Sequence, residues 1–120
     1  MSNKTKGIEG ENLARDFLLK KGWEILETNW RGERCEIDII AREGATIVFV
    51  EVKARTNAAY GWPEEAVTPA KQRNITDAAE FYLEEKYLDC EIRFDIISII
   101  SKDNTHQIYH IRDAFAPGGE

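Results

Sequence analysis

The chain has 120 residues, 42% of them hydrophobic and 32% charged, and its formal net charge is −6. This length and balance predict one globular domain over residues 1–120 and exclude a repeat or low-complexity protein. No apolar run reaches membrane-spanning length, so we expect a cytoplasmic protein without membrane contact. The acidic balance argues against general affinity for nucleic acid, yet it is compatible with a local basic groove.

A first helix is predicted from about Gly7 to Lys21, with Gly22 as its stop. Its apolar stripe consists of Leu13, Ala14, Phe17 and Leu18. Glu11 lies at the edge of this stripe, where its carboxylate can complete an acidic cluster on a sheet. The alternative is that Glu11, like Glu9, favours the positive end of the helix dipole. Residues 23–30 then alternate like a strand, with Trp23, Ile25 and Glu27 on one face and Trp30 expected in the core.

Charged residues interrupt the next two strands, residues 36–38 and 47–53, which otherwise have the composition of buried strands. Glu51 and Lys53 share one face by the two-residue period of a strand. If Glu43-Gly44 forms a two-residue turn, Asp38 lies opposite Phe49 and diagonal to Glu51. A turn one residue longer would move Asp38 to the other face. The pattern thus predicts that Asp38, Glu51 and Lys53 converge on one patch.

Two carboxylates and an ammonium suit metal-assisted hydrolysis of a phosphodiester. Asp38 and Glu51 are the expected ligands of Mg²⁺ or Mn²⁺, with the carbonyl of Val52 as a candidate third ligand. Lys53 would orient or deprotonate the attacking water, or neutralise charge on phosphorus. The alternative interpretation is a structural salt bridge between Glu51 and Lys53 beside a solvated Asp38. Cys35 and Cys90 have no zinc-ligand spacing and are expected to be reduced thiols.

Residues 55–68 are expected to form a long connection, in which Tyr60 and Trp62 are either a surface for nucleic acid or a loop anchor. Thr68-Pro69 is the predicted start of a helix that runs to about Tyr87, with the inner stripe Ile75, Ala78, Ala79 and Tyr82. The helical spacing directs Lys71 and Gln72 toward the site and Arg73 more outward. For Lys71 and Gln72 the alternative is a solvated first turn.

The isoleucine-rich run 92–100 predicts a strand in the sheet centre, buried on both faces. Strand 47–53, the helix and strand 92–100 make a right-handed βαβ unit, which requires parallel pairing within a mixed sheet. Residues 106–111 are expected at the edge, and Arg93 with Asp95 as structural partners. His110 is either a metal ligand or, as is usual at an edge, solvated. Residues 116–120 are the predicted disordered tail.

Several motifs together resemble the YraN-like family of small uncharacterised bacterial proteins. They are Gly7-x-x-Gly10-Glu11-x-x-Ala14, Asn29-Trp30-Arg31, Glu36-Ile-Asp38, Val48-Phe-Val-Glu51-Val-Lys53-x-Arg55 and Glu65-Ala-Val-Thr-Pro69-x-Lys71-Gln72-Arg73. An acid followed by Glu-x-Lys on the next strand also resembles the PD-(D/E)XK restriction-endonuclease-like nucleases. The proline of that motif is Ile37 here, while the aspartate that carries the ligand is present.

The resemblance implies a restriction-endonuclease-like αβββαβ core in which a mixed sheet is flanked by helices, related to Holliday-junction resolvases. It implies a Mg²⁺- or Mn²⁺-dependent endonuclease acting on branched or flapped DNA, with Asp38, Glu51 and Lys53 at catalytic positions and Glu11 beside them. Arg55, Lys71, Gln72 and Arg73 are the expected contacts to nucleic acid. The alternative from another class is a non-catalytic nucleic-acid or protein interaction module, and a homodimer is left open.

Overall fold

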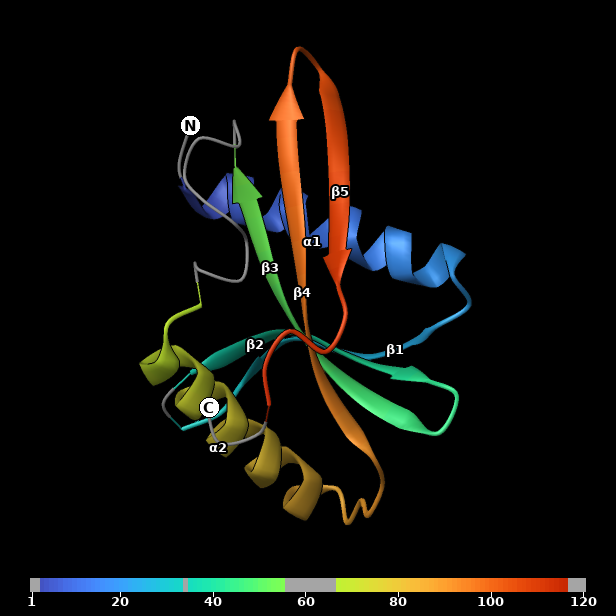
Figure 1. The fold of residues 1–120 in the computed structure, drawn as a ribbon, viewed down its shortest axis with the longest axis vertical. Helices are drawn as coiled ribbons and strands as arrows, with labels where there is room; N and C mark the ends of the chain where they lie inside the picture. Colours follow the sequence, from blue (N-terminus) through green and yellow to red (C-terminus); the bar gives the residue numbers. More distant parts are fainter. Residues whose placement is uncertain (1–2, 34, 56–66, 117–120) are drawn as a thin grey trace.

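The computed structural model describes residues 3–33, 35–55 and 67–116. In chain order the elements are α1 (Asn3–Lys20), β1 (Glu24–Arg31), β2 (Glu36–Glu43), β3 (Thr46–Arg55), α2 (Pro69–Glu85), β4 (Ile92–Lys102) and β5 (Thr105–Ile111). The strands form one five-stranded sheet in the order β1-β2-β3-β4-β5. β3 and β4 are parallel and the other neighbours are antiparallel (Figure 1). The expected mixed sheet with flanking helices and the βαβ unit are therefore confirmed.

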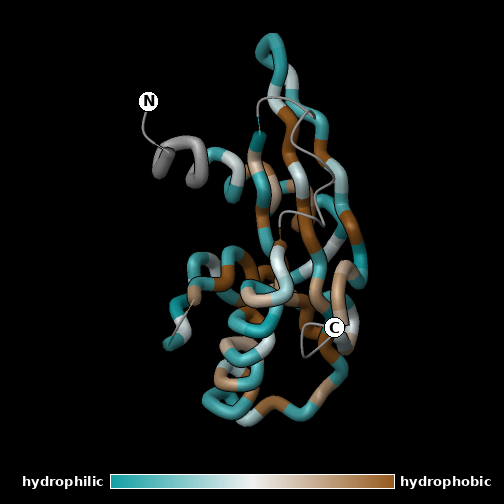
Figure 2. Tube along the Cα trace, turned by 60° about the vertical axis from the view of Figure 1, so that its left-hand side comes forward, coloured by the Kyte–Doolittle hydropathy of each residue, from teal (hydrophilic) through white to brown (hydrophobic). Residues whose placement is uncertain are grey.

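The two helices cover opposite faces of the sheet, because alternate strand residues pack into two separate cores. α1 contributes Ala14 and Leu18 to a core that also contains Val48, Val50 and Ile97. α2 contributes the predicted stripe to the other core, together with Phe49 and Phe94; the stripe is Ile75, Ala78, Ala79 and Tyr82. Figure 2 shows the hydrophobic positions concentrated along the strands, whereas the turns are hydrophilic. The centre of the sheet is thus buried on both faces.

The N-terminal half departs from the expected pattern in two places. α1 begins at Asn3, before the predicted start, and Gly22 follows its end with the positive φ of 88° that favours glycine. β1 contains a register shift between Ile25 and Glu27. A bulge reverses the alternation, so Glu27 faces α2 and accepts a hydrogen bond from the Tyr82 hydroxyl at 3.4 Å. The prediction that Glu27 shares a face with Trp23 and Ile25 is wrong for this reason.

The turn between β2 and β3 lies one residue further along the chain than expected. Glu43 pairs with Thr46, and Ile39 pairs with Val50. The turn residues are therefore Gly44 and Ala45, and Gly44 has a φ of 60° that favours glycine. Because both strands shift by one residue, the parity is unchanged. The Asp38 carboxylate meets β3 at the N–H of Val52, next to Glu51, but Asp38 does not lie opposite Phe49, whose partner is Ile40.

The C-terminal half largely follows the sequence pattern. α2 begins at Pro69, where the Thr68 hydroxyl caps the helix by accepting from the Lys71 N–H at 3.2 Å. β4 is buried from Phe94 to Ile99, although β3 rather than β4 is the middle strand. β5 lies at the edge as expected.

A network of buried charge lies on the α1 face near β4 and β5. Asp95 accepts two hydrogen bonds from Arg93, at 2.8 and 3.0 Å, which confirms their expected partnership. His110 is 2.7 Å from Asp95, and its side chain is only 4% exposed. The expectation of a solvated His110 is wrong, because the edge strand is covered there by Trp23 and Phe17 of the α1–β1 segment.

Two sets of predictions fall outside the described residues. These are the connection with Tyr60 and Trp62, and residues 117–120 of the predicted tail. Within the described part of the chain, no helix is long and apolar enough to cross a membrane. Cys35 and Cys90 are both free thiols.

Candidate functional site

The carboxylates of Asp38 and Glu51 come together where β2 and β3 separate. The ladder between these strands runs from the Glu43–Thr46 pair to the Ile39–Val50 pair. Beyond it the Val52 N–H donates a hydrogen bond of 2.8 Å to Oδ2 of Asp38. Asp38 thus takes the place of a backbone acceptor on β2, which holds its carboxylate against β3. The contact is made by the N–H of Val52, whereas the carbonyl of Val52 was the candidate third metal ligand.

Two lysines contact the same oxygen of Glu51. Lys71 Nζ lies 3.1 Å from Oε1, and Lys53 Nζ lies 3.7 Å from it. Lys53 comes from the same strand, two residues along, while Lys71 comes from the first turn of α2. The Glu51 side chain is 8% exposed, so this charge is compensated by ion pairs rather than by water. The salt bridge between Glu51 and Lys53, which the alternative interpretation predicted, is present. The solvated Asp38 of that interpretation is not, because its carboxylate accepts a hydrogen bond from β3.

The protonation equilibria reflect this crowding. Desolvation, followed by the charge of Glu51, raises the pKa of Asp38 to about 8, although the N–H of Val52 opposes the shift. Burial lowers the pKa of Lys53, assisted by the nearby Lys71 ammonium and opposed by Glu51. For Lys71, burial alone would lower the pKa, but Glu51 outweighs it and the pKa is raised. Two acids that repel each other and a lysine with a lowered pKa are typical of a functional site.

Helix α1 approaches this cluster closely at Gly10. A Cβ built on Gly10 would lie 3.0 Å from the Cβ of Ala54 on β3, so only glycine allows this approach without displacement. The following residue, Glu11, is half-buried, and its charge adds to the factors that raise the pKa of Asp38. Glu11 therefore acts electrostatically on the cluster, as the edge position of the helical stripe suggested.

The predicted nucleic-acid contacts divide into two groups. Lys71 reaches the site, whereas the Gln72 side chain donates to the Val67 carbonyl at 2.9 Å and so fixes the chain that precedes α2. Arg73 is exposed, as expected from the helical spacing, and Arg55 is half-buried at the end of β3. Gln72 is thus positioned to support the first turn of α2, and Lys71 and Arg73 are the cations that this turn presents.

The donor set fits a hard divalent cation held mainly by water. Asp38 and Glu51 supply carboxylate oxygens, and their mutual repulsion would be relieved by a cation between them. No group of three or more His, Cys, Asp or Glu side chains in the described residues could hold a metal. The cluster thus offers two carboxylates, and a cation there would take its remaining ligands from water, backbone carbonyls or substrate.

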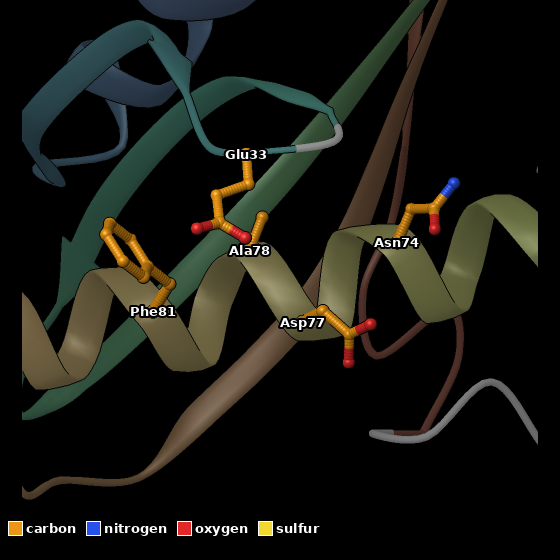
Figure 3. A pocket seen from close by; sticks show the side chains of 5 residues that line it. All are labelled: Glu33, Asn74, Asp77, Ala78 and Phe81. Carbon is orange, nitrogen blue, oxygen red and sulfur yellow. The ribbon is translucent and has the colours of Figure 1, made fainter.

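Two neighbouring features do not share this chemistry. The Cys35 thiol donates to the Asn74 carbonyl at 3.2 Å, and burial, followed by the charge of Glu51, raises its pKa. It is therefore a poor nucleophile. A cavity of about 290 Å³ lies further along α2 and is lined by Glu33, Asn74, Asp77, Ala78 and Phe81 (Figure 3). Its two carboxylates oppose phosphate binding, and its lining residues do not include Asp38, Glu51, Lys53 or Lys71.

Sequence reasoning found Asp38, Glu51 and Lys53 but missed the bond between Lys71 and Glu51. The two-residue period of a strand is enough to predict that the first three lie together. Moving the turn by one residue shifts both strands and changes their pairing by two positions, so the prediction does not depend on that displacement. The ion pair between Lys71 and Glu51 joins residues 20 positions apart on different elements. The periodicity of a single helix or strand cannot predict such a contact. The only available signal was the placement of Lys71 on the inner side of the first turn of α2.

Comparisons with known proteins consistently identify the same family. The model of the uncharacterised protein family UPF0102 matches residues 10–99. A UPF0102 protein of Geotalea daltonii is 51% identical over 115 residues, covering 94% of this chain and 91% of that protein. A UPF0102 protein of Geobacter metallireducens is 49% identical over 116 residues, covering 96% and 95%, respectively. One of Caldicellulosiruptor bescii is 48% identical over 122 residues and is covered completely.

Proposed function

The chain belongs to the uncharacterised protein family UPF0102, and from this premise we propose that it is a Mg²⁺- or Mn²⁺-dependent endonuclease acting on branched or flapped DNA. The observation that carries the proposal is the convergence of Asp38, Glu51, Lys53 and Lys71 where β2, β3 and α2 meet. Placing the Asp38 carboxylate beside that of Glu51 in a partly buried site is costly, and a bound cation would offset that cost. Membership confirms the expected family, while the resemblance to PD-(D/E)XK nucleases supports the chemistry.

Each residue has a role that follows from its environment. Asp38 and Glu51 would hold the cation, which when bound lowers the pKa of a water molecule and polarises the phosphate. Because burial lowers the pKa of Lys53, this amine accepts a proton from the attacking water more readily than a solvated lysine does. Lys71, on the first turn of α2, is placed to pair with a phosphate oxygen at a helix N-terminus. Glu11 adds negative charge that favours retention of the cation.

The preference for branched DNA follows from the charge of the whole chain. A net charge of −6 makes loose binding to duplex weak, because such binding depends on neutralising phosphates. A small basic area gains more from a bent or multi-armed backbone that brings several phosphates to it at once. Arg55, Lys71 and Arg73 would make these contacts.

The second candidate is a non-catalytic interaction module with the same fold. It is favoured by the balance within the cluster, where two ammonium groups already offset two carboxylates. The two candidates differ in whether any bond is cut.

The test is a panel of labelled four-way junctions, flaps, single strands and duplexes incubated with Mg²⁺ or Mn²⁺. Wild type should cut branched substrates, and Lys53→Ala should lose at least about a hundredfold in cleavage rate while it still binds. Lys86→Ala is the matched control, since Lys86 is an exposed lysine at the far end of α2. Cleavage that persists in Lys53→Ala would refute the assignment of the site. A wild type that neither binds nor cuts would favour the interaction module.

A further inference from the structure

Lys71 occupies an unusual position for a residue expected to bind only substrate. Its ammonium lies 3.1 Å from Oε1 of Glu51, closer than Lys53 at 3.7 Å, and the same carboxylate is a proposed cation ligand. Two like-charged groups, an ammonium and a divalent cation, would compete for one carboxylate. The contact between Lys71 and Glu51 therefore bears directly on how the cation binds.

The formal charges show the size of this competition. Asp38 and Glu51 together carry −2 when ionised, and Lys53 and Lys71 together carry +2. A divalent cation added to these four side chains leaves an excess of +2, or +1 when Glu11 is counted, in a partly buried site, which is unfavourable. A substrate phosphate supplies the missing negative charge and gives Lys71 a new partner. Cation and phosphate are thus expected to enter together more easily than the cation alone.

The local structure allows Lys71 to change partners without moving its helix. Its backbone N–H is fixed by the Thr68 hydroxyl, and Pro69 starts the helix. Its side chain, however, is 39% exposed, compared with 24% for Lys53 and 8% for Glu51. A long flexible side chain on a fixed backbone at the solvent boundary can turn from the carboxylate to an incoming phosphate by rotamer changes alone. Lys53 is more enclosed and lies on the same strand as Glu51.

We propose that Lys71 is a tethered counter-ion for Glu51, which opposes cation binding in the free protein and moves to a substrate phosphate in the complex. It thereby couples the two binding events, so that the cation is held tightly only when DNA is present. This inference rests on the proposed function, and it adds a regulatory role to a residue that sequence reasoning assigned to phosphate contact alone. Because coupling is reciprocal, the cation must strengthen DNA binding by the same factor.

The experiment measures Mn²⁺ binding by electron paramagnetic resonance, with and without a four-way junction whose phosphorothioate linkages resist cleavage. Wild type should bind Mn²⁺ weakly alone and roughly tenfold more tightly with the junction, the size expected for one neighbouring charge. Lys71→Met should bind Mn²⁺ roughly tenfold more tightly than wild type without DNA, and should gain little from the junction. Lys86→Met, the matched control, should behave as wild type, and circular dichroism confirms that each variant is folded.

The outcomes separate this inference from the proposed function. Equal Mn²⁺ affinity of wild type and Lys71→Met without DNA, together with binding that Glu51→Gln abolishes, would overturn the role of Lys71 and leave the metal site intact. Weaker Mn²⁺ binding in Lys71→Met would also overturn it, because the lysine would then support the cation rather than compete with it. Wild type that binds no Mn²⁺ in either condition would overturn the metal site, and the inference with it.

Discussion

At the scale of single residues, the pKa values of two strand aspartates, Asp95 on β4 and Asp38 on β2, are shifted in opposite directions. Asp95 is fully buried and pairs with Arg93, His110 and the backbone N–H of Asp113. Burial would raise its pKa, but these partners lower the pKa to about 2. Asp38 has fewer stabilising partners, and its pKa is raised to about 8. An acid saturated with donors is structural, whereas an acid with a raised pKa beside another carboxylate has the environment that the proposed cation site requires.

The structural role of Asp95 gives a prediction for stability. Asp95→Asn should lower the free energy of unfolding by about 2–4 kcal/mol near neutral pH, because Arg93 and His110 lose a buried carboxylate. A lowered carboxyl pKa stabilises the fold above its unfolded value of 3.8, and this stabilisation is lost as the pH falls toward 2. The difference in melting temperature between wild type and variant should therefore shrink over that range.

Thermal unfolding followed by circular dichroism across a pH series measures this difference. Asp89→Asn, at an exposed aspartate, is the control and should melt like wild type at every pH. Equal melting temperatures of Asp95→Asn and wild type near neutral pH would show that the buried network adds nothing to stability.

Only part of this residue-scale chemistry is readable from sequence. Arg93 and Asp95 are two residues apart on one strand, so their pairing follows from strand period. Glu43 also accepts a hydrogen bond from Arg93 at 2.8 Å, but it comes from a different hairpin. The burial of His110 likewise depends on Trp23, which is distant in sequence. Local periods predict neighbours on one element, and they carry no information about which elements meet.

At the scale of elements, the position of Glu11 depends on how closely α1 packs on β3. Gly10→Ala gains helix propensity of about 1 kcal/mol, but its new Cβ would meet Ala54 at 3.0 Å. Because that neighbour is a strand Cβ with no freedom to rotate away, we expect overpacking to win, with a net loss of about 1 kcal/mol. The variant should melt a few degrees lower. Displacement of α1 should also weaken Mn²⁺ binding, since Glu11 moves away from Asp38.

A double-mutant cycle with Ala54→Gly checks the mechanism. Removing the opposing methyl group should restore part of the stability lost in Gly10→Ala, giving a favourable coupling of roughly 1 kcal/mol. Additive losses in the two single variants would mean that Gly10 is needed for another reason than its approach to β3.

The elements themselves were largely predictable, and two of the errors share one cause. The periods of α2 and β4 are long and regular, so their extents and buried faces were expected correctly. The β1 bulge and the position of the Gly44 turn were not, because each changes the chain by a single residue without disturbing the hydrophobic pattern. The Asp38 carboxylate nevertheless meets β3 beside Glu51, because it accepts a hydrogen bond from the N–H of Val52.

At the scale of the whole molecule, an acidic chain is proposed to bind a polyanion through one restricted area. Arg73 is exposed on α2, and Arg55 ends β3, the strand that carries Glu51 and Lys53. The two arginines thus come from the same two elements as Lys53 and Lys71, the lysines that contact Glu51. The βαβ unit explains why these elements are near each other, because the end of the first strand and the first turn of the following helix lie at the same end of such a unit.

The last prediction concerns the salt dependence of DNA binding. Each phosphate contact contributes a slope of about −0.9 to the dependence of log affinity on log salt for duplex DNA. Replacing Arg55 and Arg73 together by alanine should therefore weaken binding to every substrate and reduce the slope by about 2. A Lys20/Lys86 double alanine removes the same charge from the C-terminal ends of α1 and α2, and it should leave the slope unchanged. Fluorescence anisotropy with a labelled four-way junction measures both slopes without requiring cleavage. If both double variants reduce the slope equally, binding would depend on total charge rather than on this area, and the preference for branched DNA would lose its physical basis.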